Sequence, residues 1–129
     1  MTEPEAGRNY PQQVGIDAYG NGGFRFAGIS HRGSLLCLPS GMAAWQVAAG
    51  PLTLDALRPV LAEADDIDVL LIGLGMDIAP LAPEIRQAFR ERSVIVEAIA
   101  TGGAVRTYNV LLAEQRAVAA ALIAVDRVR

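Results

Sequence analysis

The sequence predicts a single α/β domain, and three observations lead to this prediction. Between residues 69 and 112, strand-like and helix-like segments alternate, an order that favours parallel strands joined by helical crossovers. The first third instead has short apolar runs separated by glycine-rich turns, which is typical of an antiparallel meander. A chain of 129 residues, 52% of them apolar, is long and apolar enough to bury one core.

The meander is expected from three short strands over residues 14–19, 24–29 and 34–38. Residues 20–23 form the first turn, because Gly-Asn-Gly-Gly tolerates positive φ. Residues 30–33 form the second turn. Apolar and polar side chains alternate along the second strand, so we expect a sheet with one solvated face.

The remaining elements follow from capping residues and apolar periodicity. Thr53 is a suitable N-cap for a helix over residues 53–64, which Pro59 either kinks or divides by starting a second short helix. Pro83 is well placed to begin a later helix. We also expect strands over residues 69–72 and 94–99, and a helix over residues 101–112.

The segment from residue 117 to residue 125 is ambiguous. Its alanines favour a helix, whereas its short, continuous apolar run also fits a fully buried strand. Composition alone favours the helix.

Charge and composition exclude several classes of function. The net charge is −3, with 11 basic and 14 acidic residues, so no broad nucleic-acid-binding surface is expected and adhesion to anionic membranes is disfavoured. The chain has no lysine, which excludes Schiff-base chemistry. Its single cysteine, Cys37, excludes an intramolecular disulfide and a thiolate-cluster metal site. We expect no cofactor and no bound metal.

The first residues carry no targeting signal. We expect residues 1–13 to form a flexible tail and residues 14–129 to form the domain. The longest apolar stretch is far shorter than the roughly 20 residues that cross a bilayer. We therefore expect a cytoplasmic protein that does not insert into the membrane.

A ligand site, if there is one, is expected where parallel strands end. In such sheets the crevice lies at the carboxyl ends of the strands. The loops there are residues 73–77, with Gly73, Gly75 and Asp77, and residues 100–103, with Thr101 and Gly102. The first loop is not a dinucleotide fingerprint, because Ile78 occupies the place of the third glycine.

The start of the helix expected over residues 101–112 is a candidate anion site. Backbone N–H groups of residues 101–103 lie beside the positive end of the helix, and Arg106 follows one turn later. Asn109 lies three residues beyond Arg106, so both face one side of the helix. The alternative is structural: Thr101 caps the helix, the glycines allow close packing, and Arg106 pairs with Glu97 or Glu114.

Other candidate residues have simpler interpretations. His31 is expected as a solvated turn residue and Cys37 as a small core residue. Trp45 is either a core side chain or an exposed anchor for a partner. We find no nucleophile motif or acid–base pair, which is weak evidence against an enzyme.

Four phrases of the sequence belong together. They are residues 16–20 with 23–25, residues 33–36 with 38–39 and Trp45, residues 71–75, and a set in the third expected helix and the turn after it: Thr101, Ala104, residues 106–111, Glu114 and Arg116. Together they resemble one known family of small domains, the family of mitochondrial complex I assembly factor 3 and the adipogenesis-associated domain protein of animals. The match spans roughly residues 14–125.

The resemblance implies a three-layer α/β domain with a mixed central sheet. The last strand of that fold runs antiparallel to its neighbours, so residues 117–125 become a strand. No catalytic residues come with the resemblance.

The resemblance implies a non-enzymatic protein-binding or assembly factor, acting in membrane-protein or respiratory-complex assembly. Its partners would include membrane-protein export or assembly components, and a homodimer stays open. The expected surface includes Gly73, Gly75, Asp77, Trp45, and residues 101–109. The alternative function is a domain or enzyme that binds a small carboxylate or phosphate in the same crevice.

Overall fold

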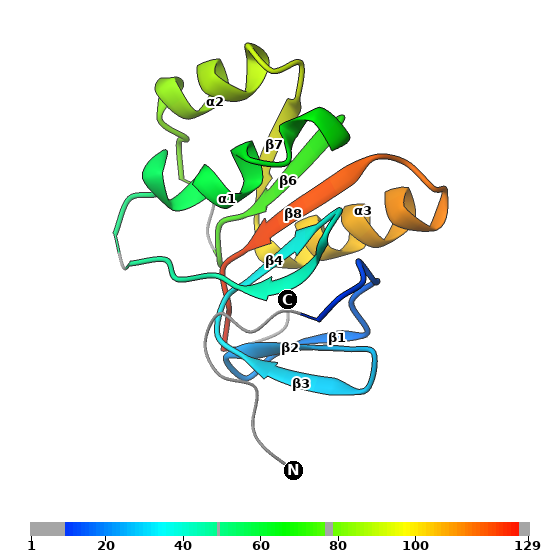
Figure 1. The fold of residues 1–129 in the computed structure, drawn as a ribbon. Coiled ribbons are helices and arrows are strands. Elements are labelled where there is room, and N and C mark those ends of the chain that lie inside the picture. Colours follow the sequence, from blue (N-terminus) through cyan, green and yellow to red (C-terminus); the bar gives the residue numbers. More distant parts are fainter. Residues whose placement is uncertain (1–9, 49, 77–78, 127–129) are drawn as a thin grey trace.

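The structure is a computed structural model that describes residues 10–48, 50–76 and 79–126. The strands of this part of the chain form two sheets (Figure 1). A small antiparallel sheet has the order β1-β2-β3, with β1 at Ala18–Gly20, β2 at Gly23–Phe26 and β3 at Ile29–Arg32. A mixed sheet has the order β5-β4-β8-β6-β7. Its strands are β4 (Leu35–Leu38), β5 (Gly41–Ala44), β6 (Val69–Gly73), β7 (Ile95–Ile99) and β8 (Val118–Leu122).

The meander is confirmed, but its third strand was placed wrongly. Residues 29–32, expected largely as a turn, form β3, in which half-buried Ile29 and His31 alternate with exposed Ser30 and Arg32. Alternating burial with a period of two is typical of a strand. It was not recognised in the sequence because Ser30, His31 and Arg32 are polar. The strand expected next, now β4, is buried throughout and pairs with β5 and β8 in the other sheet.

The single helix expected over residues 53–64 is wrong. The chain forms a 3₁₀ turn at Asp55–Leu57, the short helix α1 at Arg58–Leu61 and a second 3₁₀ turn at Ala64–Asp66. Pro59 lies in the first turn of α1, where its missing N–H costs nothing. Its second interpretation, the start of a new short helix, is therefore the correct one.

Two longer helices begin where the sequence predicts. Helix α2 is Pro83–Arg90 and helix α3 is Thr101–Ala113. The segment after α3 is a strand, β8, as the family resemblance implies. Strand β8 runs antiparallel to β4 but parallel to β6. The expectation that it is antiparallel to its neighbours is therefore confirmed for β4 and wrong for β6.

The large sheet separates two apolar clusters, which makes the fold three-layered. One cluster joins α1 and α2 to one face of the sheet through residues such as Val60 and Phe89. The other joins α3 and the small sheet to the opposite face through residues such as Phe24 and Tyr108. Strand β8 is central and wholly buried, and its three consecutive alanines let both outer layers approach closely.

Part of the expected N-terminal tail is held against the domain. Tyr10 and Met42 exchange backbone hydrogen bonds of 2.7 and 2.9 Å. The Gln13 side chain donates to the Val118 carbonyl at 2.7 Å. Residues 10–13 are thus attached to the large sheet.

Candidate functional site

The two loops singled out from the sequence meet at one edge of the sheet. The Thr101 N–H donates to the Gly75 carbonyl at 2.9 Å, and the Gly75 N–H donates to the Thr101 hydroxyl at 3.0 Å. This confirms that the carboxyl ends of β6 and β7 open at the same place.

Thr101 is a structural residue of this edge. Its side chain is fully buried, and its hydroxyl also donates to the Ile123 carbonyl at 2.7 Å. The chain segments after β6 and β8 are therefore tied to the start of α3 by one oxygen. Gly73 lies beneath it, where a Cβ would be 3.0 Å from the Thr101 Cα. Neither residue lines the pocket described next. Thr101 is not the expected N-cap, because the N-cap of α3 is Ala100 and no side chain caps the helix. Its role is still structural, since its hydroxyl bonds to the segments after β6 and β8.

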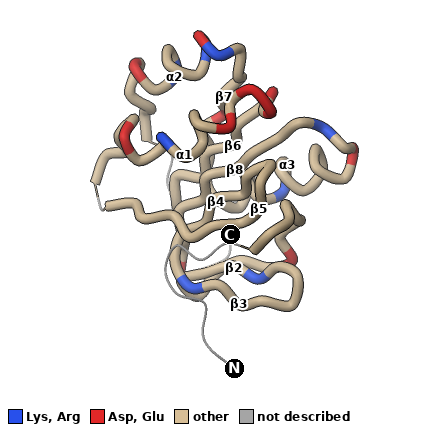
Figure 2. Tube along the Cα trace, viewed as in Figure 1, with Lys and Arg blue, Asp and Glu red and all other residues tan. Residues whose placement is uncertain are grey.

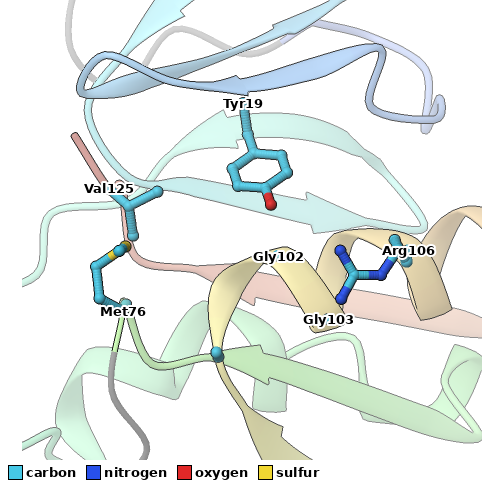
Figure 3. A pocket seen from close by; sticks show the side chains of 8 residues that line it. Tyr19, Met76, Gly102, Gly103, Arg106 and Val125 are labelled. Carbon is cyan, nitrogen blue, oxygen red and sulfur yellow. The ribbon is translucent and has the colours of Figure 1, made fainter. Parts of the chain in front are cut away.

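A pocket of about 240 Å³ lies beside this junction, at the start of α3 (Figure 3). Its lining residues come from β1, the loop after β6, the start of α3 and the chain after β8: Tyr19, Gly75, Met76, Ala100, Gly102, Gly103, Arg106 and Val125. Of the residues predicted for the site, Gly75, Gly102 and Arg106 meet here. Asp77 lies outside the described residues.

Tyr19 and Val125 were missed as lining residues, whereas Met76 lies in the loop of residues 73–77 that the sequence predicts. Only the tertiary fold brings Tyr19 and Val125 to the start of α3. Tyr19 is the middle residue of β1, and its hydroxyl lies so close to Gly102 that a Cβ there would collide with the phenol oxygen. The only signal in the sequence for Tyr19 was its presence in the first family phrase.

The pocket is positively polarised on one side. Figure 3 shows the Arg106 guanidinium and the Tyr19 hydroxyl directed toward the start of α3. Arg106 is exposed and makes no ion pair with any carboxylate in the described ranges, so the alternative pairing with Glu97 or Glu114 is wrong. The N–H groups of Gly102 and Gly103 have no acceptor among the described residues. Such groups at a helix start favour an anion.

Asn109 and Trp45 do not belong to this surface. The Asn109 amide accepts from the Ile16 N–H and donates to the Ile16 carbonyl, both at 2.8 Å, so it holds the N-terminal segment as a strand partner would. Trp45 is only 5% exposed and donates its indole N–H to the Ala56 carbonyl at 2.8 Å. Of the two interpretations that the sequence leaves open, the core side chain is therefore the correct one, and Trp45 is not an exposed anchor.

The remaining reactive groups are buried or structural. Cys37 is fully buried as predicted, and burial raises the pKa of its thiol, which disfavours a nucleophilic thiolate. Burial also raises the pKa of Tyr108, whose hydroxyl donates to the Val14 carbonyl at 2.7 Å. His31 is in strand β3, with Nε2 3.0 Å from the Ser34 carbonyl oxygen, so the expected turn is wrong.

The described residues contain neither a metal-ligand cluster nor a membrane-spanning helix. In that part of the chain, no group of three or more histidine, cysteine, aspartate or glutamate side chains is arranged to hold a metal ion. Nor does any helix there have the length and apolarity needed to span a bilayer.

Comparison with known proteins identifies the family. Residues 16–123 match the pattern of the family described as "Protein of unknown function (DUF498/DUF598)". The chain belongs to this family. An uncharacterised member from Rhodobacter capsulatus is 41% identical over 108 residues, which cover 84% of this chain and 82% of that protein.

The family includes a mitochondrial assembly factor, as the sequence phrases implied. The mouse protein named NADH dehydrogenase [ubiquinone] 1 alpha subcomplex assembly factor 3 is 32% identical over 115 residues, which are 88% of this chain. This chain spans 62% of the length of that relative. An assembly-factor role is thus associated with the family.

A solved structure has the same fold. The crystal structure described as an outer membrane protein from Bartonella henselae is 50% identical to this chain and superposes with a TM-score of 0.86. The similarity covers 90% of this chain and 98% of that one. The mixed α/β architecture is therefore shared by this member of known structure.

Proposed function

We propose that this chain is a non-enzymatic assembly factor that binds a protein partner through the pocket at the start of α3. The mouse relative's name supports such a role for the family. For this chain the support comes from the pocket, where Arg106 and the N–H groups of Gly102 and Gly103 lie beside Met76 and Val125. Among the described residues the arginine has no carboxylate partner and the two N–H groups have no acceptor. A carboxylate carried by an apolar polypeptide segment fits this combination.

The described lining residues also favour binding over catalysis. They include no histidine, cysteine, aspartate or glutamate, the side chains that most often transfer protons or attack substrates. Arg106 and the glycine N–H groups can hold and orient a negative group. Binding is the chemistry that this set of groups performs best.

We further propose that the partner is a component of a membrane-protein or respiratory complex during its assembly, by analogy with the mouse relative. A cytoplasmic location goes with this proposal. The free, buried Cys37 is compatible with a reducing compartment. Fractionation of the native host checks the location: recovery with the cytoplasmic fraction is expected, and recovery from outside the cytoplasm would contradict it.

Co-purification tests the proposed function. The tagged chain is isolated from its native host in mild detergent, and bound proteins are identified by mass spectrometry. Arg106→Ala removes the pocket cation, whereas Arg116→Ala removes an exposed arginine outside the pocket. We expect a stoichiometric partner that is lost in Arg106→Ala and retained in Arg116→Ala. Equal recovery with both variants, or recovery of the chain alone, would contradict the proposal.

The same groups support a second candidate, the binding of a free small carboxylate or phosphate. Its specific basis is that Arg106, Gly102 and Gly103 offer their donors at one point of the pocket. Thermal unfolding with a panel of carboxylates and phosphates distinguishes the candidates. A rise in Tm with a free anion, absent in Arg106→Ala and present in Arg116→Ala, would favour the second candidate.

A further inference from the structure

The pocket lies between the small sheet and the start of α3. Tyr19 of β1 lines it from the side of the small sheet, and Gly102 and Gly103 line it from the helix. Figure 3 shows the Tyr19 ring extending from β1 toward the helix, where its hydroxyl oxygen lies against Gly102. The separation between the small sheet and α3 therefore sets the width of the pocket on this side.

Asn109, seven residues after Gly102 in α3, attaches the chain that leads into β1. Its amide accepts from the Ile16 N–H and donates to the Ile16 carbonyl, both at 2.8 Å. The approach is close, because a Cβ at Gly15 would lie 3.2 Å from the Asn109 Oδ1. A side chain at position 15 would therefore press against the amide that holds Ile16.

The two contacts occur in opposite order along the chain segment and the helix. Ile16 is followed three residues later by Tyr19, whereas Asn109 is preceded seven residues earlier by Gly102. Three extended residues span at most about 11 Å, and seven helical residues rise about 10 Å. The chain from Ile16 to Tyr19 therefore runs antiparallel to α3 over a similar length and contacts it near both ends.

Tyr19 is held from two sides. Beyond it, the turn of residues 20–23 donates two backbone N–H groups to carbonyls of the chain after β8, at 3.1 and 2.9 Å. Before it, the two hydrogen bonds to Ile16 both come from one side chain, that of Asn109. Pairing with β2 places β1 within the small sheet but does not attach it to the helix. A single substitution at position 109 therefore releases one side of Tyr19 and leaves the other side attached.

We propose that Asn109 is a positioning residue of the pocket. Through Ile16 it holds the small sheet at the separation from α3 that keeps the Tyr19 hydroxyl against Gly102, so the release of Ile16 widens the pocket. The importance of this positioning for binding rests on the proposed function, whereas the positioning itself is measurable without a ligand.

A thermodynamic cycle between positions 102 and 109 tests the positioning role. Gly102→Ala puts a Cβ against the Tyr19 hydroxyl, so it should raise the equilibrium constant for unfolding, measured in denaturant. In an Asn109→Ala background, Tyr19 can withdraw from the added Cβ. We expect the rise caused by Gly102→Ala to be at least about threefold smaller there than in the wild-type chain. A purely structural role of Asn109 would change stability without changing that rise.

Two controls separate this coupling from general destabilisation. Val110→Ala changes the exposed residue next to Asn109, so the effect of Gly102→Ala should be the same in that background as in the wild-type chain. Gly103→Ala places its Cβ against the end of Ile99 in β7 and not against the small sheet. Its effect should therefore add to that of Asn109→Ala.

Nuclear Overhauser contacts give a second measurement, which needs only folded protein. The Tyr19 ring protons and the Gly102 α-protons should give a signal in the wild-type chain, and we expect this signal to weaken in Asn109→Ala. Contacts between β1 and β2 should persist, which would show that the small sheet itself is intact. Gly15→Ala should weaken the same signal, because its Cβ presses on the Asn109 amide.

Either of two results would overturn the proposal. One is an additive cycle, in which Gly102→Ala has the same effect with and without the Asn109 side chain. The other is a signal between Tyr19 and Gly102 of unchanged strength in both Asn109→Ala and Gly15→Ala. Neither measurement uses a ligand, so failure to recover a partner in the co-purification counts against the proposed function alone.

Discussion

At the residue scale, the buried hydroxyl of Thr101 holds the pocket edge together. It donates to the Ile123 carbonyl and accepts from the Gly75 N–H, so a single side chain satisfies two backbone groups from different segments. Buried backbone groups without partners are costly, which explains why a polar residue lies fully buried here. The sequence placed Thr101 at the helix start, but its bonding partners lie 22 and 26 residues away and only the fold supplies them.

Thr101→Val should destabilise the fold by about 2–3 kcal/mol. Valine has nearly the same shape, but it leaves the Gly75 N–H and the Ile123 carbonyl unsatisfied. Thr101→Ser keeps the hydroxyl and should cost about 1 kcal/mol or less. Denaturant unfolding measures both variants, and equal losses would show that the methyl group, not the hydroxyl, is what matters.

Gly102→Ala should destabilise the protein by about 1–3 kcal/mol, although alanine is the better helix former. The added Cβ meets the Tyr19 phenol oxygen. In a Tyr19→Phe background the cost of the same change should fall, and a thermodynamic cycle of the four proteins measures that coupling. Gly103→Ala is the matched comparison, since its Cβ would meet flexible side chains, the end of Ile99 at 3.2 Å and Arg106 Nη2 at 3.9 Å. A cost as large as that of Gly102→Ala, or a cycle without coupling, would refute this reading of the site.

At the scale of elements, one side chain of α3 makes the two backbone hydrogen bonds that a neighbouring strand would otherwise make. The Asn109 amide pairs with both backbone groups of Ile16, which fixes the chain just before β1. The helical spacing predicts that Arg106 and Asn109 face the same side of the helix. Arg106 lines the pocket, but Asn109 does not, because a distant backbone segment occupies its amide.

Asn109→Ala should release this segment. We expect hydrogen exchange at the Ile16 amide to accelerate by about tenfold or more, because its acceptor is lost. Arg106→Ala, on the same helix, should leave that exchange rate unchanged. An Ile16 amide that stays protected in Asn109→Ala would show that packing alone holds the segment.

Element prediction succeeded where a local pattern and the final environment agree. Pro83 begins α2, and the apolar runs of β6 and β7 are strands. It failed for β3, where polar residues hid the alternation, and for residues 53–64, where Pro59 starts a new helix. For β8, composition favoured a helix, whereas the family resemblance favoured the strand that the structure has. Composition failed because the helix propensity of alanine does not take into account burial between two layers, which is a tertiary property.

At the scale of the whole molecule, stability should decline at alkaline pH. Burial raises the pKa of Cys37 above its usual value of 9.0 and that of Tyr108 above 10.0. Between the usual and the raised pKa, the unfolded chain has lost a proton that the folded chain keeps. The free energy of unfolding is therefore greatest below pH 9 and falls as pH rises, by about 1.4 kcal/mol per pH unit for each group.

Calorimetry between pH 8 and pH 11 checks this decline. In Cys37→Ala the thiol contribution is absent, so the fall should begin near pH 10 instead of pH 9. Curves for the two proteins that run parallel throughout this range would contradict the assignment to Cys37.

The whole-molecule prediction from sequence was strongest for the fold and weakest for the site. The two loops that form the pocket edge were found, because strand ends in α/β sheets converge. Tyr19, which the small sheet contributes to the pocket, was not found, because no local sequence pattern indicates that β1 packs over the start of α3. Trp45 was left undecided for the same reason, since aromatic residues occur both in cores and at interfaces.

The most direct test of the central claim is site-specific photocrosslinking in the native host. A photoreactive phenylalanine replaces Tyr19, which lines the pocket and leaves Arg106 in place, or, as the control, Arg58 on the opposite face of the sheet, which is exposed and forms an ion pair with Asp55. If the pocket holds a protein partner, a single covalent adduct forms from position 19 and is absent from position 58. No adduct from position 19, or the same adducts from both positions, would contradict a protein-binding role for the pocket.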